Sequence, residues 1–539
     1  MRSIVKRILV TCAATTALAL LLTMVLCALG NAMAPKWQVE PFTEHITLTT
    51  TNTAIQAVDP ATGAVLETPQ EGAYRTKETH ITVALDGGKT VNAIVREPLD
   101  APADRPACLF LHGSGTGKSS EAFGDVANAM ASAGITTLVP DKRLDNYTML
   151  HRDYVSSAHD YAKSLEILRK WPGVSRSETG IYAESEGTWI ATILTSKRQD
   201  IAFAILTSAP VFNGREQMAM AVSAYTHEAG APKPVVKDMA KLMSLDYAPF
   251  DLAYADFDAD RYLKSLTMPV LVNYGTYDTA MPIEQGAQRI IATANKSGNE
   301  NVTVRYFAGN HQMRAGEGLF TPNLPLAEGY TQALENWVNG VTAGTKADGW
   351  ATPQVAGATP HQRFIAPQRT RSGIVGSLGV LAGLMVAGPV LIVMAAILGI
   401  GLTVFSWLQT LLAGRRSVAT VRAMHATPSG LGAAQQRTLH GIAGLSAGIG
   451  TAVMVITVLL YGYMSAVGVS AVLVMPQPRL FAVGWVVLRI ATMLLAWEME
   501  RVWYCRADIV GVRRVICVMV ALGTLATLMT LAFWGLFSL

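Results

Sequence analysis

The chain has 539 residues, of which 50% are hydrophobic and only 15% are charged, with a formal net charge of +4. This length predicts two or three domains, and so small a net charge argues against a nucleic-acid partner. The apolar excess lies in residues 8–30 and after residue 372. We therefore expect a membrane protein whose middle region is an ordinary globular domain. None of the five cysteines forms a pair with the spacing of a metal site.

The N-terminus carries three basic residues and then an uncharged run of 23 residues, from Ile8 to Gly30. A membrane span needs about 20 residues, whereas the apolar core of a signal peptide has roughly 7–15. Run length therefore favours a retained anchor in residues 1–34, although Ala32-Met33-Ala34 resembles a cleavage site and leaves a removed signal peptide as the alternative. In both cases residue 35 onward is expected outside the cytoplasm.

The middle region, residues 35–343, alternates strand-like and helix-like runs. The expected strands are 43–53, 78–98, 107–111, 135–139, the run entering residue 184, 201–206, 269–274 and 302–307. The expected helices are 121–133, 154–171, 188–195, 283–294 and 326–341. Strands that alternate with helices predict an α/β fold with a mostly parallel sheet and helices on both faces. Catalytic groups of such folds gather at the carboxyl ends of the strands.

A sharp turn is expected at Ala183-Glu184-Ser185-Glu186-Gly187, between a strand and a helix. A nucleophile elbow needs small residues two places before and two places after the nucleophile, and here they are Ala183 and Gly187. The usual first residue is glycine, so Ala183 is a mild departure from the pattern. Strain in such a turn exposes the hydroxyl of Ser185 to a substrate.

A second turn, from His112 to Ser119, is rich in glycine and follows the strand 107–111. It resembles a phosphate-binding loop, but His112 stands where that motif requires its first glycine, so we exclude nucleotide binding. Backbone N–H groups of Gly113 or Ser114 are instead suited to stabilising an oxyanion.

Asp278 and His311 also follow apolar strand-like runs, which gives the chain order Ser185, Asp278, His311. Together with His112-Gly113-Ser114-Gly115, Pro140-Asp141-Lys142-Arg143 and Gly309-Asn310-His311, these motifs resemble the α/β-hydrolase superfamily, in particular dienelactone hydrolases and acyl thioesterases. The resemblance covers residues ~76–343 and implies an α/β-hydrolase fold. The long uncharged runs after residue 372 add a helical transmembrane domain to it.

The resemblance implies a serine hydrolase mechanism. Ser185 would be the nucleophile, His311 its general base, and Asp278 the group that orients the imidazole. The oxyanion would be bound by the backbone N–H of Glu186 and one from Gly113 or Ser114. This chemistry needs neither a metal nor an organic cofactor.

Each assignment has a competing interpretation. Ser185 could cap a helix, and the Asp-rich stretch from Asp251 to Asp260 offers rival carboxylates. His311 could be a surface histidine. Glu184 and Glu186 are expected to be solvated neighbours of the serine, and their charge would disfavour an anionic group at the scissile bond.

Residues 211–266 interrupt the alternation and contain four methionines. They are either an ordinary helical insertion with a methionine core or a lid whose soft side chains adapt to an apolar substrate. A linker rich in Pro, Thr, Gly and Gln follows the domain, from residue 344 to residue 372.

The C-terminal region, residues 373–539, is expected to cross the membrane four times, which makes five spans with the anchor. Arginines cluster in 415–437 and in 501–514, so both loops should be cytoplasmic, and residues 35–371 outside. Arg489 falls inside a span, where it is either a functional residue or a structural one that snorkels toward the interface or bonds to backbone carbonyls.

We therefore expect a multi-pass plasma-membrane hydrolase with an extracytoplasmic catalytic domain, acting on an acyl ester or thioester of a lipid or acylated envelope molecule. The alternatives are an acyltransferase with the same acyl-enzyme, a peptidase, or a transport or scaffold protein whose hydrolase domain only binds. The sequence leaves the oligomeric state open.

Overall fold

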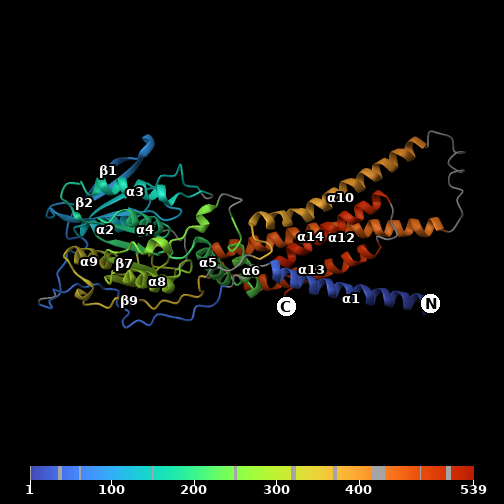
Figure 1. Ribbon diagram of the computed structural model, residues 1–539, viewed down its shortest axis with the longest axis horizontal. Helices are drawn as coiled ribbons and strands as arrows, with labels where there is room; N and C mark the ends of the chain where they lie inside the picture. Colours follow the sequence, from blue (N-terminus) through green and yellow to red (C-terminus); the bar gives the residue numbers. More distant parts are fainter. Residues whose placement is uncertain are drawn as a thin grey trace. The chain divides into compact units, whose positions relative to one another are not determined.

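The computed structural model describes residues 2–33, 39–59, 62–148, 151–247, 252–316, 323–367, 373–413, 431–473, 475–505 and 511–538. The chain divides into two compact units (Figure 1). The catalytic unit consists of Gln38–Tyr225 and Phe250–Arg369. The membrane unit consists of Met1–Trp37, Thr226–Pro249 and Thr370–Leu539. Most of the expected insertion, between residues 226 and 249, therefore folds with the membrane helices.

A nine-stranded sheet forms the centre of the catalytic unit, with the strand order β1-β2-β4-β3-β5-β6-β7-β8-β9. Its strands are β1 Thr76–Ala84, β2 Thr90–Pro98, β3 Arg105–Leu111, β4 Thr136–Pro140, β5 Val174–Glu184, β6 Ala204–Thr207, β7 Val270–Gly275, β8 Val302–Phe307 and β9 Val355–Gly357. β2 pairs antiparallel with β1 and β4, and the pairs from β4 through β9 are parallel. The predicted mostly parallel sheet is confirmed. Strands β3, β4, β6, β7 and β8 are buried along most or all of their length because both faces of the sheet are covered.

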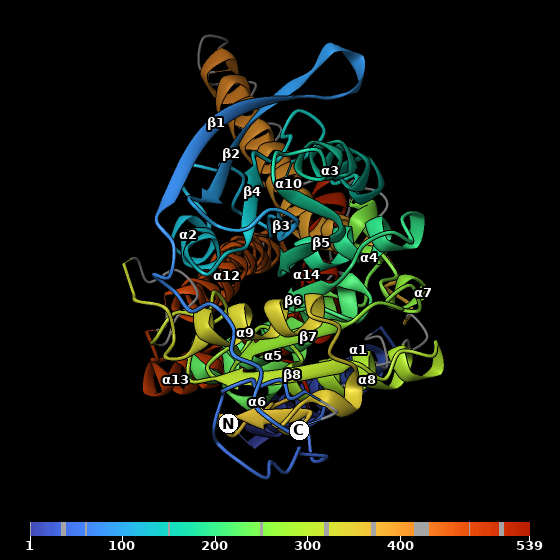
Figure 2. The same cartoon turned by 90° about the vertical axis from the view of Figure 1, so that its left-hand side faces the viewer.

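Helices cover both faces of this sheet (Figure 2). The helices of the catalytic unit are α2 Gly124–Ser132, α3 Tyr154–Leu168, α4 Gly187–Lys197, α7 Asp260–Leu263, α8 Ile283–Lys296 and α9 Tyr330–Thr342, and α5 Gly214–Glu228 begins in it. One buried cluster packs α2 and α9 against the sheet through residues such as Met130 and Trp337. The other packs α3, α4 and α8 through residues such as Leu165, Ile190 and Ile290. Helix α4, which begins directly after Ser185, is therefore packed against the sheet through this second buried cluster.

The predicted strand at residues 43–53 is wrong, because no strand forms there. Its backbone groups bond mainly to side chains, with a single bond from the N–H of Gly357 in β9 to the Thr50 carbonyl. The N–H of Ile46 donates to Glu284 Oε1 at 2.7 Å, and the Thr53 carbonyl accepts from Arg305. Residues 344–367, expected as a linker, supply the edge strand β9 and Gln362, whose backbone N–H donates to Glu284 Oε2.

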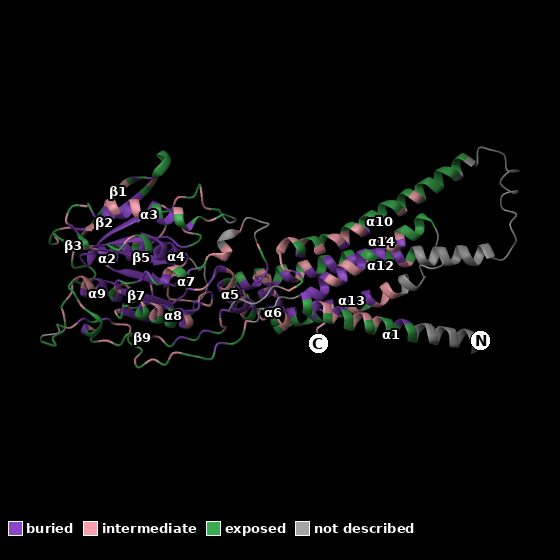
Figure 3. Cartoon of the chain, viewed as in Figure 1, coloured by how far each residue is buried: buried purple, intermediate pink, exposed green. Residues whose placement is uncertain are grey.

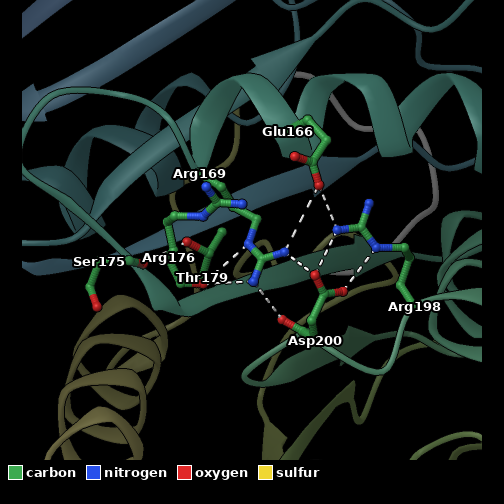
Figure 4. A network of polar contacts seen from close by, with 7 residues as sticks. All are labelled: Glu166, Arg169, Ser175, Arg176, Thr179, Arg198 and Asp200. Atoms are coloured by element: carbon green, nitrogen blue, oxygen red, sulfur yellow. Dashed lines mark hydrogen bonds and ion pairs between the residues drawn. The ribbon is translucent and has the colours of Figure 1, made fainter.

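An ion network fastens the segment that carries β5 and α4 (Figure 4). The buried guanidinium of Arg169, just after α3, donates to the carbonyl of Arg176 in β5 at 2.8 Å and pairs with Asp200, after α4. Arg198 pairs with the same carboxylate and with Glu166 of α3. The strand and helix on either side of residue 185 are therefore tied to α3.

The membrane unit is helical. Its helices are α1 Arg2–Met33, α6 Lys233–Leu242, α10 Leu378–Ala413, α12 Leu431–Val472, α13 Pro478–Cys505 and α14 Val512–Phe533. Among the described residues, five helices are long and apolar enough to cross a membrane, all except α6. Figure 3 shows α10 with a largely exposed surface, which includes Ile397, Phe405 and Trp407. Large apolar side chains exposed in this way are expected of a lipid-facing helix.

Segment 226–247 lies against one end of the helices of this unit. The backbone of Asp246 forms an isolated parallel β-bridge with Ser377, directly before α10. The backbone N–H of Gln477, before α13, donates to the carbonyl of Ala229. Gly535, after α14, lies close to the carboxylate of Asp238. The arginine-rich loops join the opposite helix ends, after Ala413 and after Cys505, and both are partly outside the described residues.

Arg489 of α13 donates to the backbone carbonyl of Ser538 at 2.7 Å. Of the two interpretations of this intramembrane charge, the structure shows the bond to a backbone carbonyl. Such a bond offsets part of the cost of an arginine in a membrane span.

Candidate active site

Ser185 stands at the bend between β5 and α4 with a φ of 54°, in the left-handed region that a serine rarely adopts. Its N–H donates to the carbonyl of Thr207 at the end of β6, which holds the bend to the neighbouring strand. Its own carbonyl accepts from the N–H and hydroxyl of Thr188, in the first turn of α4. The sharp turn predicted at residues 183–187 is therefore present, with a strained serine at its apex.

Two glycines allow the chain to pass close to this bend. A Cβ on Gly187 would lie 2.6 Å from the carbonyl oxygen of Leu111 and 2.8 Å from that of His112. A Cβ on Gly113 would lie 2.9 Å from the carbonyl oxygen of Glu184 and 3.1 Å from the Cβ of Ser185. The turn that follows β3 thus lies directly against the elbow, and any larger side chain at either glycine would separate them.

His311 and Asp278 are hydrogen-bonded to each other, Nδ1 to Oδ2, at 2.7 Å. The Asp278 side chain is fully buried, and the His311 side chain is 11% exposed. Asp278 follows β7 and His311 follows β8, two adjacent strands. Both therefore lie at the carboxyl ends of the parallel strands, where Ser185 follows β5. Ser208, after β6, donates to the carbonyl of His311 at 2.7 Å and fixes the histidine loop from a third strand.

Ser208 was missed by the sequence reasoning. Its only sequence signal is a polar residue directly after the strand that neighbours β5. It also has a positive φ of 50°. Asn310, which is buried, accepts the N–H groups of Gln312 and Arg314 and shapes the other side of the histidine loop.

The imidazole of His311 has a perturbed pKa. Burial lowers the pKa, but the charge and hydrogen bond of Asp278, with a smaller contribution from Glu184, outweigh it and raise the pKa above 6.5. Burial raises the pKa of Glu184 to about 7, against the opposing charges of His311 and Arg314. A histidine whose pKa is raised by a fully buried carboxylate is suited to accept and return a proton.

The turn from His112 to Ser119 is held in place by the end of β4. The ring Nε2 of buried His112 donates to the carbonyl of Pro140 at 2.9 Å, and burial lowers the pKa of this histidine to about 4, so it is neutral. Ser119 donates to Asp141 through both its N–H and its hydroxyl, each at 2.7 Å. Among the described residues, no hydrogen bond occupies the backbone N–H of Gly113, Ser114 or Glu186. Those three donors remain available to a ligand.

The expectation that Glu184 and Glu186 are solvated is wrong, because both are buried, at 7% and 5% exposure. The carboxylate of Glu186 is paired with the side chains of Lys142 and Arg152. The hydroxyls of Tyr147 and Tyr154 also donate to it. The charge of Glu186 is therefore neutralised, and it does not argue against an anionic group near Ser185.

The residues around Glu186 were not predicted as functional. Lys142 belongs to a motif that we noted after a predicted strand, and a lysine directly after an apolar run was the available signal. Arg152 and the two tyrosines lie in and after a loop that gave no signal. Among the described residues, no group of three or more His, Cys, Asp or Glu side chains is placed to hold a metal ion.

A family model described as "BAAT / Acyl-CoA thioester hydrolase C terminal" matches residues 160–339, which include Ser185, Asp278 and His311. The matched residues contain the parallel strands β5 to β8, with the elbow directly after β5. This part of the chain has an α/β-hydrolase fold. It is similar to esterases and thioester hydrolases, and helices long and apolar enough to span a membrane follow the α/β-hydrolase domain in the same chain.

Solved structures similar to the α/β-hydrolase domain include an esterase of Pyrococcus furiosus, 16% identical, which covers 54% of this chain and 98% of its own with a TM-score of 0.36. Another is Est1E from Butyrivibrio proteoclasticus, 15% identical, which covers 49% of this chain and 98% of its own with a TM-score of 0.33. A cold-adapted esterase from an Arctic intertidal metagenomic library is 17% identical and covers 45% of this chain and 90% of its own, with a TM-score of 0.29. A search of curated proteins gave no match.

Proposed function

We propose that this protein is a membrane-anchored serine hydrolase that cleaves a long-chain acyl ester or thioester with a Ser185, His311, Asp278 triad. The observation that carries the proposal is the 2.7 Å bond between His311 and Asp278, at the sheet edge that also presents the strained Ser185. His311 accepts the serine proton and later protonates the leaving group, and Asp278 keeps the imidazole in the required tautomer.

The oxyanion of the tetrahedral intermediate is stabilised by backbone N–H groups. One comes from Glu186, directly after the nucleophile, and one from the turn at Gly113 and Ser114. The proximity of Gly113 to Ser185 and the absence of other partners for these donors among the described residues support this role. Each such donor lowers the barrier by about 3 kcal/mol.

We further propose that the α/β-hydrolase domain lies outside the cytoplasm. The arginines after α10 and around the turn between α13 and α14 mark the cytoplasmic side by the positive-inside rule. The segment 226–247, which connects twice to the catalytic unit, packs at the opposite helix ends. The five spans then comprise the retained anchor α1 and four C-terminal crossings.

The substrate is an acylated lipid or envelope molecule that reaches the site from the bilayer. Five apolar helices exceed what tethering a soluble enzyme requires, since a single span is enough. The matched family model is named for acyl-CoA thioester hydrolases, which supports the inclusion of thioesters. Because Glu186 is neutralised, the charge of the group next to the acyl bond is not restricted by that carboxylate.

An acyl-chain series tests the substrate class. Each methylene that enters an apolar cleft contributes about 0.8 kcal/mol, or about fourfold in kcat/KM, until the cleft is full. The full-length protein in detergent should therefore hydrolyse p-nitrophenyl esters with kcat/KM rising from C4 to longer chains, and Ser185→Ala should be inactive on all of them. A preference for the acetyl ester would contradict the lipid substrate.

A further inference from the structure

A single buried ammonium group joins the two segments that we assign to the oxyanion hole. The Nζ of Lys142 donates to the carbonyl oxygen of Gly113 at 2.8 Å and to Glu186 Oε1 at 3.3 Å. Its side chain is only 1% exposed. Gly113 lies on the turn after β3 and Glu186 directly before α4, so Lys142, which follows β4, connects these two segments.

We propose that Lys142 is a positioning residue that sets the orientation of the oxyanion-hole donors. The inference rests on the proposed hydrolase function and adds a residue to it. The carbonyl of Gly113 and the N–H of Ser114 belong to one planar trans peptide and point in opposite directions. A bond from Lys142 to that carbonyl therefore directs the N–H of Ser114 away from Lys142. This choice selects Ser114, rather than Gly113, as the donor that acts with Glu186.

The other end of the link is equally constrained. Arg152 pairs with Glu186 Oε2, to which Tyr154 also donates, and Tyr147 donates to Oε1. Lys142 lies 4.0 Å from the centre of the Tyr147 ring. Removing a partner of a buried carboxylate is destabilising, because it leaves a desolvated charge that is less well compensated. The side chain of Glu186 is thereby immobilised, together with the backbone that bears its N–H.

The cluster also has a favourable charge. Two cations, Lys142 and Arg152, surround one carboxylate, Glu186, so the ionised group has a net charge of +1 next to the two donors. Burial lowers the pKa of Lys142, and the ion pair with Glu186 opposes that shift. A fixed positive potential close to a developing oxyanion lowers the barrier without reorganisation.

The test uses the full-length protein in detergent, with kcat expressed per active site titrated by a fluorophosphonate. Lys142→Met should lower kcat about 10- to 100-fold, approaching the loss of one oxyanion donor. KM should stay within about twofold, and the acid limb of the pH profile, set by His311, should not move. Lys77→Met is the matched control, because Lys77 is an exposed lysine on β1 that pairs with Glu97 at 3.4 Å, outside the oxyanion-hole turn. It should keep the wild-type kcat.

A double variant separates positioning from simple charge neutralisation. In Lys142→Met with Glu186→Gln, no unpaired carboxylate remains, but the carbonyl of Gly113 is still released. Its kcat should remain about 10-fold or more below wild type, and Lys142→Arg, which can donate to both acceptors, should recover most of the rate. A wild-type kcat in Lys142→Met or in the double variant, or a change in KM alone, would overturn the proposal.

If Lys142→Met does not fold, the comparison of Lys142→Arg with the double variant still decides the question. A protein that is not a serine hydrolase at all would give a different result from one in which only the role of Lys142 is wrong. In that case the wild-type protein shows no fluorophosphonate adduct on Ser185, and no variant needs to be compared.

Discussion

The Oδ2 of Asp278 receives the Nδ1–H of His311 at 2.7 Å, in a position where the carboxylate is fully buried. A buried carboxylate in this geometry fixes the tautomer of the imidazole and leaves Nε2 free to accept a proton. Asp278→Asn should therefore lower kcat by about 10⁴-fold while the protein stays folded. Turnover of an activated ester measures the loss. Asp258→Asn, at an exposed carboxylate in the same Asp-rich stretch that offered the rival assignments, should be unaffected.

The raised pKa of His311 predicts the pH dependence of the reaction. The imidazole must be neutral to act as a base, so kcat/KM should fall as the pH drops through the folded pKa, above 6.5. The carboxylate of Glu184 favours the protonated imidazole. Glu184→Gln should therefore shift the acid limb to lower pH, as measured by a pH–rate profile. An acid limb that stays in place or moves to higher pH would show that Glu184 does not act on His311.

The network of Arg169 and Asp200 makes a prediction about stability. Arg169 donates to the Arg176 carbonyl, and loss of a hydrogen bond to a charged group costs about 1.5–3 kcal/mol. The free energy of unfolding of Arg169→Met should therefore be lower than that of the wild type by about this amount. Urea denaturation of the full-length protein checks this. Lys170→Met, at the exposed neighbouring position, is the control.

The same network predicts how stability depends on pH. The hydrogen bonds from Arg198 and then Arg169 lower the pKa of Asp200 in the folded protein. A lowered folded pKa means that the stabilisation is complete above the unfolded value, about 3.9, and is lost as the pH falls below it. The stability difference between wild type and Asp200→Asn should be constant above about pH 5 and shrink toward pH 3. A difference that grows at acid pH would contradict the assignment.

Much of the catalytic unit was predictable because its signals are local. Apolar runs identify β3, β4, β7 and β8 to within a residue or two. Ser185, Asp278 and His311 were predictable because each follows an apolar strand-like run of the sequence, in the chain order serine, aspartate, histidine. The burial of Glu186 was not predictable, because Lys142 and Arg152 approach it from distant parts of the chain.

The structure at the ends of the catalytic unit was also not predictable from local sequence patterns, because it depends on contacts with distant parts of the chain. Residues 43–53 have the composition of a strand, but their partners are side chains such as Glu284, so no pattern within the stretch indicates a coil. β9 is three residues long and lies in a Pro- and Gly-rich stretch. Residues 226–249 resemble an ordinary helical insertion, and only their contacts assign them to the membrane unit.

The proposed topology predicts which loops a membrane-impermeant reagent reaches. In a cysteine-free background, Lys346→Cys should react with an impermeant maleimide in intact cells. Ser417→Cys, in an arginine-rich loop outside the described residues, should react only after permeabilisation. Reaction of the cysteine at 417 in intact cells would reverse the orientation of the C-terminal spans.

Covalent labelling tests the central claim most directly. The full-length protein would be treated with a fluorophosphonate, digested, and analysed by mass spectrometry for the modified residue. We predict one adduct, on Ser185, that is absent from Ser185→Ala together with ester hydrolysis. An adduct on another residue, or hydrolysis by Ser185→Ala at the wild-type rate, would contradict the assignment of Ser185 as the nucleophile.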